Sequence, residues 1–131
     1  MYQLQLADEI VERIREREVR YDPQAYLFLL GALEFSQERR PVRGHIGGEE
    51  LAWACRDFAL EQFGLTAHTV LRHWGVGSTT DLGRIVFTLV DIGLLVSQPQ
   101  DRIEDFADVY QFGEAFDAEY PWRGIDHIGG T

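Results

Sequence analysis

The sequence predicts a mainly α-helical protein with a small β-hairpin, in which a winged helix-turn-helix-like core is preceded by two helices. Apolar residues recur at helical spacing in successive segments, and turn signals separate these segments. A short helix, a tight turn and a further helix then follow one another, which is the order of a helix-turn-helix. Two short apolar stretches around a proline-containing turn complete that order as the wing.

The length of the chain favours one compact unit with an appendage. The chain has 131 residues, close to the commonest domain size. Hydrophobic residues make up 45% of it, which excludes a wholly disordered protein. We predict a helical winged-helix-like domain over residues 1–110 and an acidic aromatic C-terminal arm over residues 111–131.

Two helices are expected to precede the core. The first is predicted over residues 4–20, because apolar residues recur every four positions from Leu6 to Ile14. Acids placed one turn before bases give it further support. The second is predicted to begin at Asp22 and Pro23, with the aspartate as N-cap and the proline as first helical residue. Its apolar residues surround the axis, which is typical of a buried central helix.

A loop is predicted over residues 37–48, which are rich in glycine and contain a local cluster of bases. This cluster makes the loop a candidate contact site. The alternative is a connector whose arginines pair with nearby acids. The candidate residues in the loop are Arg39, Arg40, Arg43 and His45.

The next helix is predicted to begin at Glu49 and Glu50, because first helical turns favour acids. Gly64 fits the left-handed position that ends such a helix. Cys55 on its apolar face is interpreted as a core residue, because nothing near it in sequence would lower its pKa. A single cysteine cannot form an internal disulfide, which favours a reducing compartment.

The helix-turn-helix is predicted in the middle of the chain. A short helix begins after Thr66 and closes at Gly75, and Ser78 then caps the following helix. Apolar residues at helical spacing begin at Leu82, and Gly93 ends the element.

The hairpin is predicted after this helix. Residues 94–96 form one short strand, residues 97–101 the turn, and residues 103–109 the returning strand. Winged helices bind DNA in some proteins and other proteins elsewhere, so the fold alone leaves the function open.

Charge excludes some classes of partner. The chain carries 22 acids against 12 bases, for a net charge of −10. All its bases are arginine, and the last 34 residues hold eight acids against two arginines. This balance is unfavourable for nucleic acid and for an anionic membrane surface. We see neither a secretory signal pattern nor an apolar run of about 18 residues, and expect a cytoplasmic protein without a membrane partner.

DNA binding is kept as an alternative function. The outer face of the third core helix would carry the base-reading side chains, namely Thr79, Thr80 and Arg84. One arginine does not offset the two acids on the same element, Asp81 and Asp91. Nucleic acid is therefore an unexpected partner.

Catalytic and metal-binding motifs are missing from the sequence. His68 and His73 are five positions apart and do not share a helical face, so no metal site is predicted. No cofactor is expected either. A small enzyme or ligand-binding protein remains an alternative if one pocket joins four cationic side chains. These are Arg43, His45, Arg72 and His73.

The C-terminal part of the sequence combines aromatic with acidic side chains. In one interpretation the arm packs its rings on the helical core, and in the other it docks on a basic, grooved partner. The candidate aromatic residues are Phe106, Tyr110, Phe112, Phe116 and Trp122.

Three sequence blocks occur in a definite order: Phe63-Gly64, His73-Trp74-Gly75 and the Asp-Phe-x-Asp-x-Tyr block from Asp105 to Tyr110. Together with residues 22–35, 45–51 and 83–87 they resemble a small bacterial protein family of unknown function. The resemblance covers about residues 20–117. It implies no activity, cofactor or site residue, because none is assigned to such proteins.

The function we predict is a cytosolic protein-interaction or regulatory module with a protein partner of basic character. The missing catalytic signatures and the acidic, ring-rich end motivate it. A homodimer is compatible with the apolar residues left over on the first helix.

Overall fold

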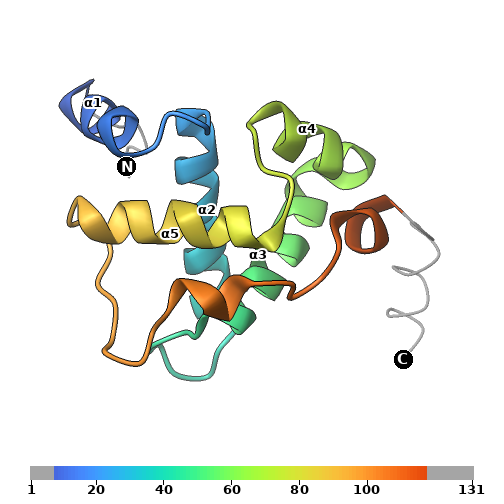
Figure 1. Ribbon diagram of the computed structural model, residues 1–131. Helices are drawn as coiled ribbons and strands as arrows, with labels where there is room; N and C mark the ends of the chain where they lie inside the picture. Colours follow the sequence, from blue (N-terminus) through green and yellow to red (C-terminus); the bar gives the residue numbers. More distant parts are fainter. Residues whose placement is uncertain (1–7, 118–131) are drawn as a thin grey trace.

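The computed structural model describes residues 8–117, and this part of the chain is built from helices and connecting segments (Figure 1). The elements in chain order are α1 (Asp8–Arg17), α2 (Pro23–Glu38), α3 (Gly48–Phe63), η1 (Gly64–Thr66), α4 (Ala67–His73), α5 (Thr79–Asp91), η2 (Ile103–Phe106) and η3 (Gly113–Asp117).

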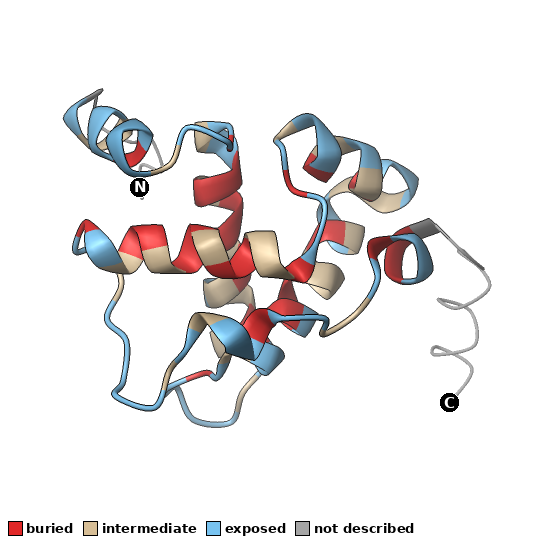
Figure 2. Cartoon of the chain, viewed as in Figure 1, coloured by how far each residue is buried: buried red, intermediate tan, exposed pale blue. Residues whose placement is uncertain are grey.

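Helix α2 lies in the centre of the molecule, and its predicted start is confirmed. The Asp22 carboxylate accepts a hydrogen bond from the Gln24 backbone N–H at 2.8 Å, and Pro23 is the first helical residue. Tyr26 and Leu29 are completely buried on α2. Figure 2 shows the buried residues concentrated along α2 and α5, where the two helices cross.

Helix α1 is the least covered of the long helices. It spans Asp8–Arg17, within the range predicted for it, and residues 1–7 lie outside the described part. Of its apolar residues Ile14 is fully buried, whereas Ile10 and Val11 are half-buried. One residue thus anchors α1, mainly against α5.

Helices α2 and α3 form a hairpin, and a layer of rings fills the space between α2, α3 and α4. Phe28 lies 5.4 Å from Phe58 and 5.9 Å from Trp74, measured between ring centroids. Glu49 and Glu50 occupy the first turn of α3, as predicted. The glycines predicted to end helices have positive φ angles, 55° at Gly64, 90° at Gly75 and 87° at Gly93.

Helix α5 begins where the sequence predicts its cap. The Ser78 hydroxyl accepts a hydrogen bond from the Asp81 N–H at 3.3 Å. The Asp81 carboxylate in turn accepts hydrogen bonds from the Tyr21 hydroxyl, from Gly77 N–H at 2.8 Å and from Arg84 at 2.9 Å. One side chain therefore joins the start of α5 to the segment before α2.

The predicted β-hairpin is wrong, because residues 8–117 contain no strand. The N–H groups of Leu94 and Leu95 bond back to the Leu89 carbonyl at 2.9 and 3.3 Å. Leu94 and Leu95 thus belong to the turn that closes α5, and residues 94–96 form no strand. The segment predicted to return begins with the short helix η2, at whose start the Asp105 carboxylate accepts the Arg102 N–H at 3.1 Å.

Two glycines explain why η2 docks as it does. A Cβ atom at Gly83 would lie 2.9 Å from the Phe106 side chain, and one at Gly48 would lie 3.0 Å from the Phe106 ring. The ring therefore lies directly on the backbones of α3 and α5 and is 3% exposed. This close contact holds the segment as a helical turn over α5, where a wing would project away from the core.

The first residues of the predicted arm pack on the helices. Phe112 and Phe116 are buried, with ring centroids 5.1 Å apart, and the π-helical turn η3 contacts α3 and α4. Residues 118–131, including Trp122, lie outside the described part. The boundary at residue 110 remains a prediction.

Candidate functional site

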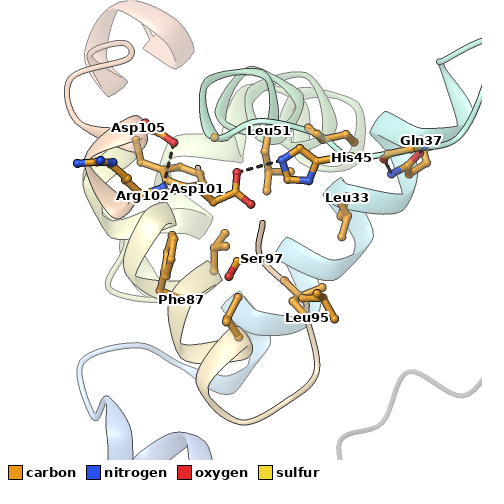
Figure 3. Close-up of a pocket in the computed structure, with 17 residues that line it drawn as sticks. Leu33, Gln37, His45, Leu51, Phe87, Leu95, Ser97, Asp101, Arg102 and Asp105 are labelled. Carbon is orange, nitrogen blue, oxygen red and sulfur yellow. Dashed lines mark hydrogen bonds and ion pairs between the residues drawn. The ribbon is translucent and has the colours of Figure 1, made fainter. Parts of the chain in front are cut away.

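A cavity of about 170 Å³ lies between α2, α3, α5 and the segment that leads from α5 to η2 (Figure 3). We call it the His45 pocket. Most of its lining is apolar, and most of these apolar residues are buried or half-buried. The apolar lining consists of Leu33, Ile46, Leu51, Val86, Phe87, Val90, Leu95, Val96 and Phe106.

The rim of the pocket is polar and is closed by a pair of side chains from distant parts of the chain. His45 Nε2 lies 2.9 Å from Asp101 Oδ1, although the residues are 56 positions apart (Figure 3). The second oxygen of Asp101 accepts the Gln98 N–H at 2.7 Å. Asp105 accepts the Arg102 N–H at 3.1 Å at the start of η2. Each rim carboxylate is thereby oriented by the backbone of its own segment.

The arginines of the loop before α3 pair within the protein. Arg39 lies 3.1 Å from an Asp57 oxygen, and Arg43 makes two hydrogen bonds of 2.9 Å to Glu34. The hydrogen bond from Arg43 lowers the pKa of Glu34. These pairs are exposed, so each contributes little to stability. They do, however, shape the loop that carries His45.

Arg40 positions His45 directly. Its guanidinium donates a hydrogen bond to the His45 carbonyl at 2.8 Å and lies 3.7 Å from Glu50. The Gln37 side chain adds a further tie, because it accepts the Gly44 N–H at 3.0 Å. In the structure the loop's cations thus act as positioning groups for the rim of the pocket.

The ligand-binding alternative required four cationic side chains, Arg43, His45, Arg72 and His73, to line one pocket. The structure does not bring them together. Arg72 and His73, at the end of α4, line a different hollow together with Arg15 and Arg20. His45 lines the pocket without Arg43, which is paired with Glu34 instead. A pocket joining all four is therefore absent from the described residues.

Of the three side chains predicted to read DNA, only Thr79 is buried. Thr79 is 1% exposed, and its hydroxyl accepts the Val109 N–H at 3.2 Å. Arg84 donates a hydrogen bond to Asp81 at 2.9 Å. Thr80 is half-buried. The face turned toward η2 thus serves packing, and the wing that would accompany a reading helix does not form within residues 8–117.

The aromatic candidates divide between core and pocket. The Tyr110 hydroxyl donates a hydrogen bond to the Ala52 carbonyl at 2.7 Å, and burial raises the pKa of Tyr110. Its ring stacks on Phe112 at 5.9 Å. Phe106 forms a wall of the His45 pocket. Phe112 and Phe116 lie in the buried cluster on α3 and α4.

Reactive and metal-binding groups are scarce in the described residues. Cys55 is 1% exposed, and burial raises the pKa of its thiol. Within residues 8–117 no three His, Cys, Asp or Glu side chains are grouped so as to hold a metal ion. In the same range no helix combines the length and apolar character needed to cross a membrane.

For several residues that line the pocket, no feature of the sequence indicates a role in a site. Asp101, Ser97 and Leu95 fall in the segment predicted as strand and turn, and Leu33 belongs to a helix that is apolar on all sides. His45 could be singled out, because it lies among glycines and arginines. Its partner Asp101 could not, since only the tertiary fold brings the two together.

The resemblance to a bacterial family remains a prediction. In comparisons with family models, with curated proteins and with solved structures, the chain matched none.

Proposed function

We propose that this protein is a cytoplasmic protein-interaction module, and that the His45 pocket holds a single apolar side chain of its partner. The observation that carries the proposal is the size of the cavity together with its lining. The single cysteine of the sequence supports the cytoplasmic part of the proposal.

The volume favours an anchoring side chain over a whole small molecule. Sites for drug-sized ligands measure about 300–1,000 Å³, whereas this cavity measures about 170 Å³. A dry cavity of about 150 Å³ accepts a molecule the size of benzene. The ring of a phenylalanine or the branched end of a leucine is of that size. Buried anchors of this kind supply much of the binding energy at protein interfaces.

The surroundings of the pocket indicate what should flank the anchor. Exposed acids follow one another on η2 and beside it, including Glu104, Asp105 and Asp108. Val96, which lines the pocket, is 91% exposed and would be covered by a partner. An apolar anchor with arginine or lysine beside it therefore complements this face.

A photo-crosslinking experiment tests the proposal. Benzoylphenylalanine replaces Val96 at the pocket in one variant and Leu65, which is 70% exposed elsewhere, in a second. Both proteins are irradiated in the cells from which the sequence comes, and the products are identified by mass spectrometry. We expect a discrete crosslinked protein from position 96 that position 65 does not give.

A blocked pocket provides the control. A Cβ atom at Gly44 meets nothing within 4 Å, and Gly44 lines the pocket, so Gly44→Trp adds bulk there without a clash at Cβ. Gly113→Trp makes the same change in open space at η3. The crosslink should disappear with Gly44→Trp and persist with Gly113→Trp. Equal products from positions 96 and 65, or a product unaffected by Gly44→Trp, would refute the proposal.

A further inference from the structure

A second hollow runs along the hairpin of α2 and α3. This α2–α3 groove has a volume of about 650 Å³, and its apolar lining includes Leu30, Phe35 and Phe58. All three side chains are half-buried, so the core leaves part of each uncovered. Leu33 lines both this groove and the His45 pocket, which makes the two hollows neighbours with otherwise separate linings.

The floor of the groove depends on a close contact. A Cβ atom at Gly31 would lie 3.0 Å from the Phe58 ring, so the glycine lets that ring lie against the backbone of α2. Phe58 in turn lies 5.3 Å from Phe35, measured between ring centroids. On α2 the lining extends from Leu30 to Glu38, about 12 Å at 1.5 Å per residue. The groove is therefore two helical turns long.

The rim of the groove is acidic on both helices. Glu34 and Glu38 lie one turn apart on α2, Glu61 lies in the last turn of α3, and all three are exposed. Arg43 pairs with Glu34. Neither Glu38 nor Glu61 forms an ion pair with any residue in the range 8–117. Arg43 offsets the charge of Glu34 and acts more weakly on Glu38, so a cation from outside would face mainly Glu38 and Glu61.

We propose that the α2–α3 groove binds a basic amphipathic helix of a partner protein. Apolar side chains at positions i, i+4 and i+7 of such a helix span two turns, which is the length of the groove. Glu38 is the last residue of α2, whereas Glu61 lies at the far end of the returning helix α3 (Figure 1). Each glutamate would therefore lie opposite a cation of the bound helix, one near each end of that helix.

A second copy of this chain does not fit the groove. Each copy carries a net charge of −10, and like charges across an interface are unfavourable. Helix α1 is amphipathic, but its sequence Asp8–Arg17 holds four acids against three arginines. The occupant is therefore a different protein, one with a surplus of lysine or arginine.

Two synthetic helices of about 15 residues test the proposal. Both carry leucines on one face, and the polar face carries lysine in one and glutamate in the other. Binding to the full chain is measured by fluorescence anisotropy. We expect saturable binding of the lysine helix that weakens as salt rises from about 50 to about 300 mM, and no binding of the glutamate helix.

Charge-matched variants locate the binding. Glu38→Gln with Glu61→Gln should weaken binding of the lysine helix about tenfold, because each exposed charge pair contributes a few-fold. Glu12→Gln with Glu16→Gln, on exposed positions of α1, changes the net charge equally and should leave binding unchanged. All four positions are exposed, so both double variants should unfold at the same denaturant concentration as the unchanged chain.

The same probe separates this proposal from the pocket. Gly44→Trp should bind the lysine helix like the unchanged chain, and the backbone NMR signals of Gly31 and Phe35 should shift on binding. Equal weakening by both double variants would overturn the proposal, as would shifts confined to Gly44 and Ser97. A stable dimer in sedimentation that excludes the lysine helix would assign the groove to a second copy instead.

Discussion

His45 Nε2 lies 2.9 Å from Asp101 Oδ1, and this contact joins the loop before α3 to the segment between α5 and η2. The side chain of Asp101 is only 16% exposed, although the segment around it is exposed. The pair therefore fixes the polar rim of the pocket more than it stabilises the whole fold.

Replacing His45 with alanine should loosen the segment it holds. We expect His45→Ala to lower the free energy of unfolding by less than about 1 kcal/mol, since the pair is partly exposed. Trypsin should nevertheless cut faster after Arg102, as followed by mass spectrometry. His73→Ala, which removes an exposed histidine from another hollow, is the control. Identical cleavage rates in the two variants would show that the pair does not hold the segment.

Asp81 should make stability depend on pH. Burial raises the pKa of its carboxyl, but hydrogen bonds from Tyr21 and Gly77 and the charge of Arg84 outweigh burial and lower the pKa. The ionised carboxylate then stabilises the fold above the ordinary carboxyl range near 4, and this contribution is lost as pH falls through the lowered pKa. Asp81→Asn should cost about 1–3 kcal/mol at pH 7.

Urea denaturation across pH measures the effect of Asp81. The difference in unfolding free energy between the unchanged chain and Asp81→Asn should be constant at neutral pH and shrink below about pH 4. A difference that stays constant down to pH 3 would contradict a lowered pKa of Asp81.

Tyr26 and Tyr110 should respond differently to loss of the hydroxyl. The Tyr26 hydroxyl is buried without a hydrogen bond of good geometry, and burial raises the pKa of Tyr26 to about 12 although the nearby Thr88 hydroxyl acts in the opposite direction. Tyr26→Phe should therefore change stability by less than about 0.5 kcal/mol or increase it. Tyr110→Phe removes the hydrogen bond to the Ala52 carbonyl and should cost about 1–2 kcal/mol. Thermal unfolding compares the two, and equal losses would argue against this assignment.

Gly83→Ala should destabilise the fold, although alanine normally favours a helix. The added Cβ would lie 2.9 Å from three atoms of Phe106, one of which is the Cβ of Phe106. Rotation of the phenyl ring does not move that atom away. We expect a cost of about 1–3 kcal/mol from overpacking. Gly113→Ala, where a Cβ meets nothing within 4 Å, is the matched control in chemical denaturation. If both substitutions stabilise equally, Phe106 does not depend on the glycine.

Cys55 should be unreactive in the folded protein. The thiol is buried and its pKa is raised by that burial, so little thiolate forms at neutral pH. Iodoacetamide should modify it only in denaturant, with a midpoint that matches the unfolding transition followed by circular dichroism. Rapid modification in native buffer would place Cys55 in an accessible site instead.

Local signals in the sequence were sufficient for the five α-helices of residues 8–117 but not for η2 and η3. The start of α2 at Asp22 and Pro23 and the cap of α5 at Ser78 each depend on neighbouring residues, and both predictions are confirmed. The hairpin prediction failed because short apolar runs are ambiguous between strand and helix. What decides the path of η2 is the fit of Phe106 against Gly48 and Gly83, and this contact is not local in sequence.

The candidate site was predictable only in part. The loop around His45 attracts notice through its glycines and arginines, yet those arginines pair with Glu34, Asp57 and Glu50 and leave the histidine at the rim. Asp101 meets His45 from 56 positions away. Such a pairing depends on how α2, α3 and α5 pack together, which periodicity in a single sequence does not reveal.

Phe106 links occupancy of the pocket to unfolding of the chain. Its ring is a wall of the pocket and also the contact that docks η2 on α3 and α5. A guest that touches this ring only in the native state stabilises that state, by about 2.7 kcal/mol when present at 100 times its dissociation constant. A ligand that fills the pocket should therefore raise the melting temperature of the protein.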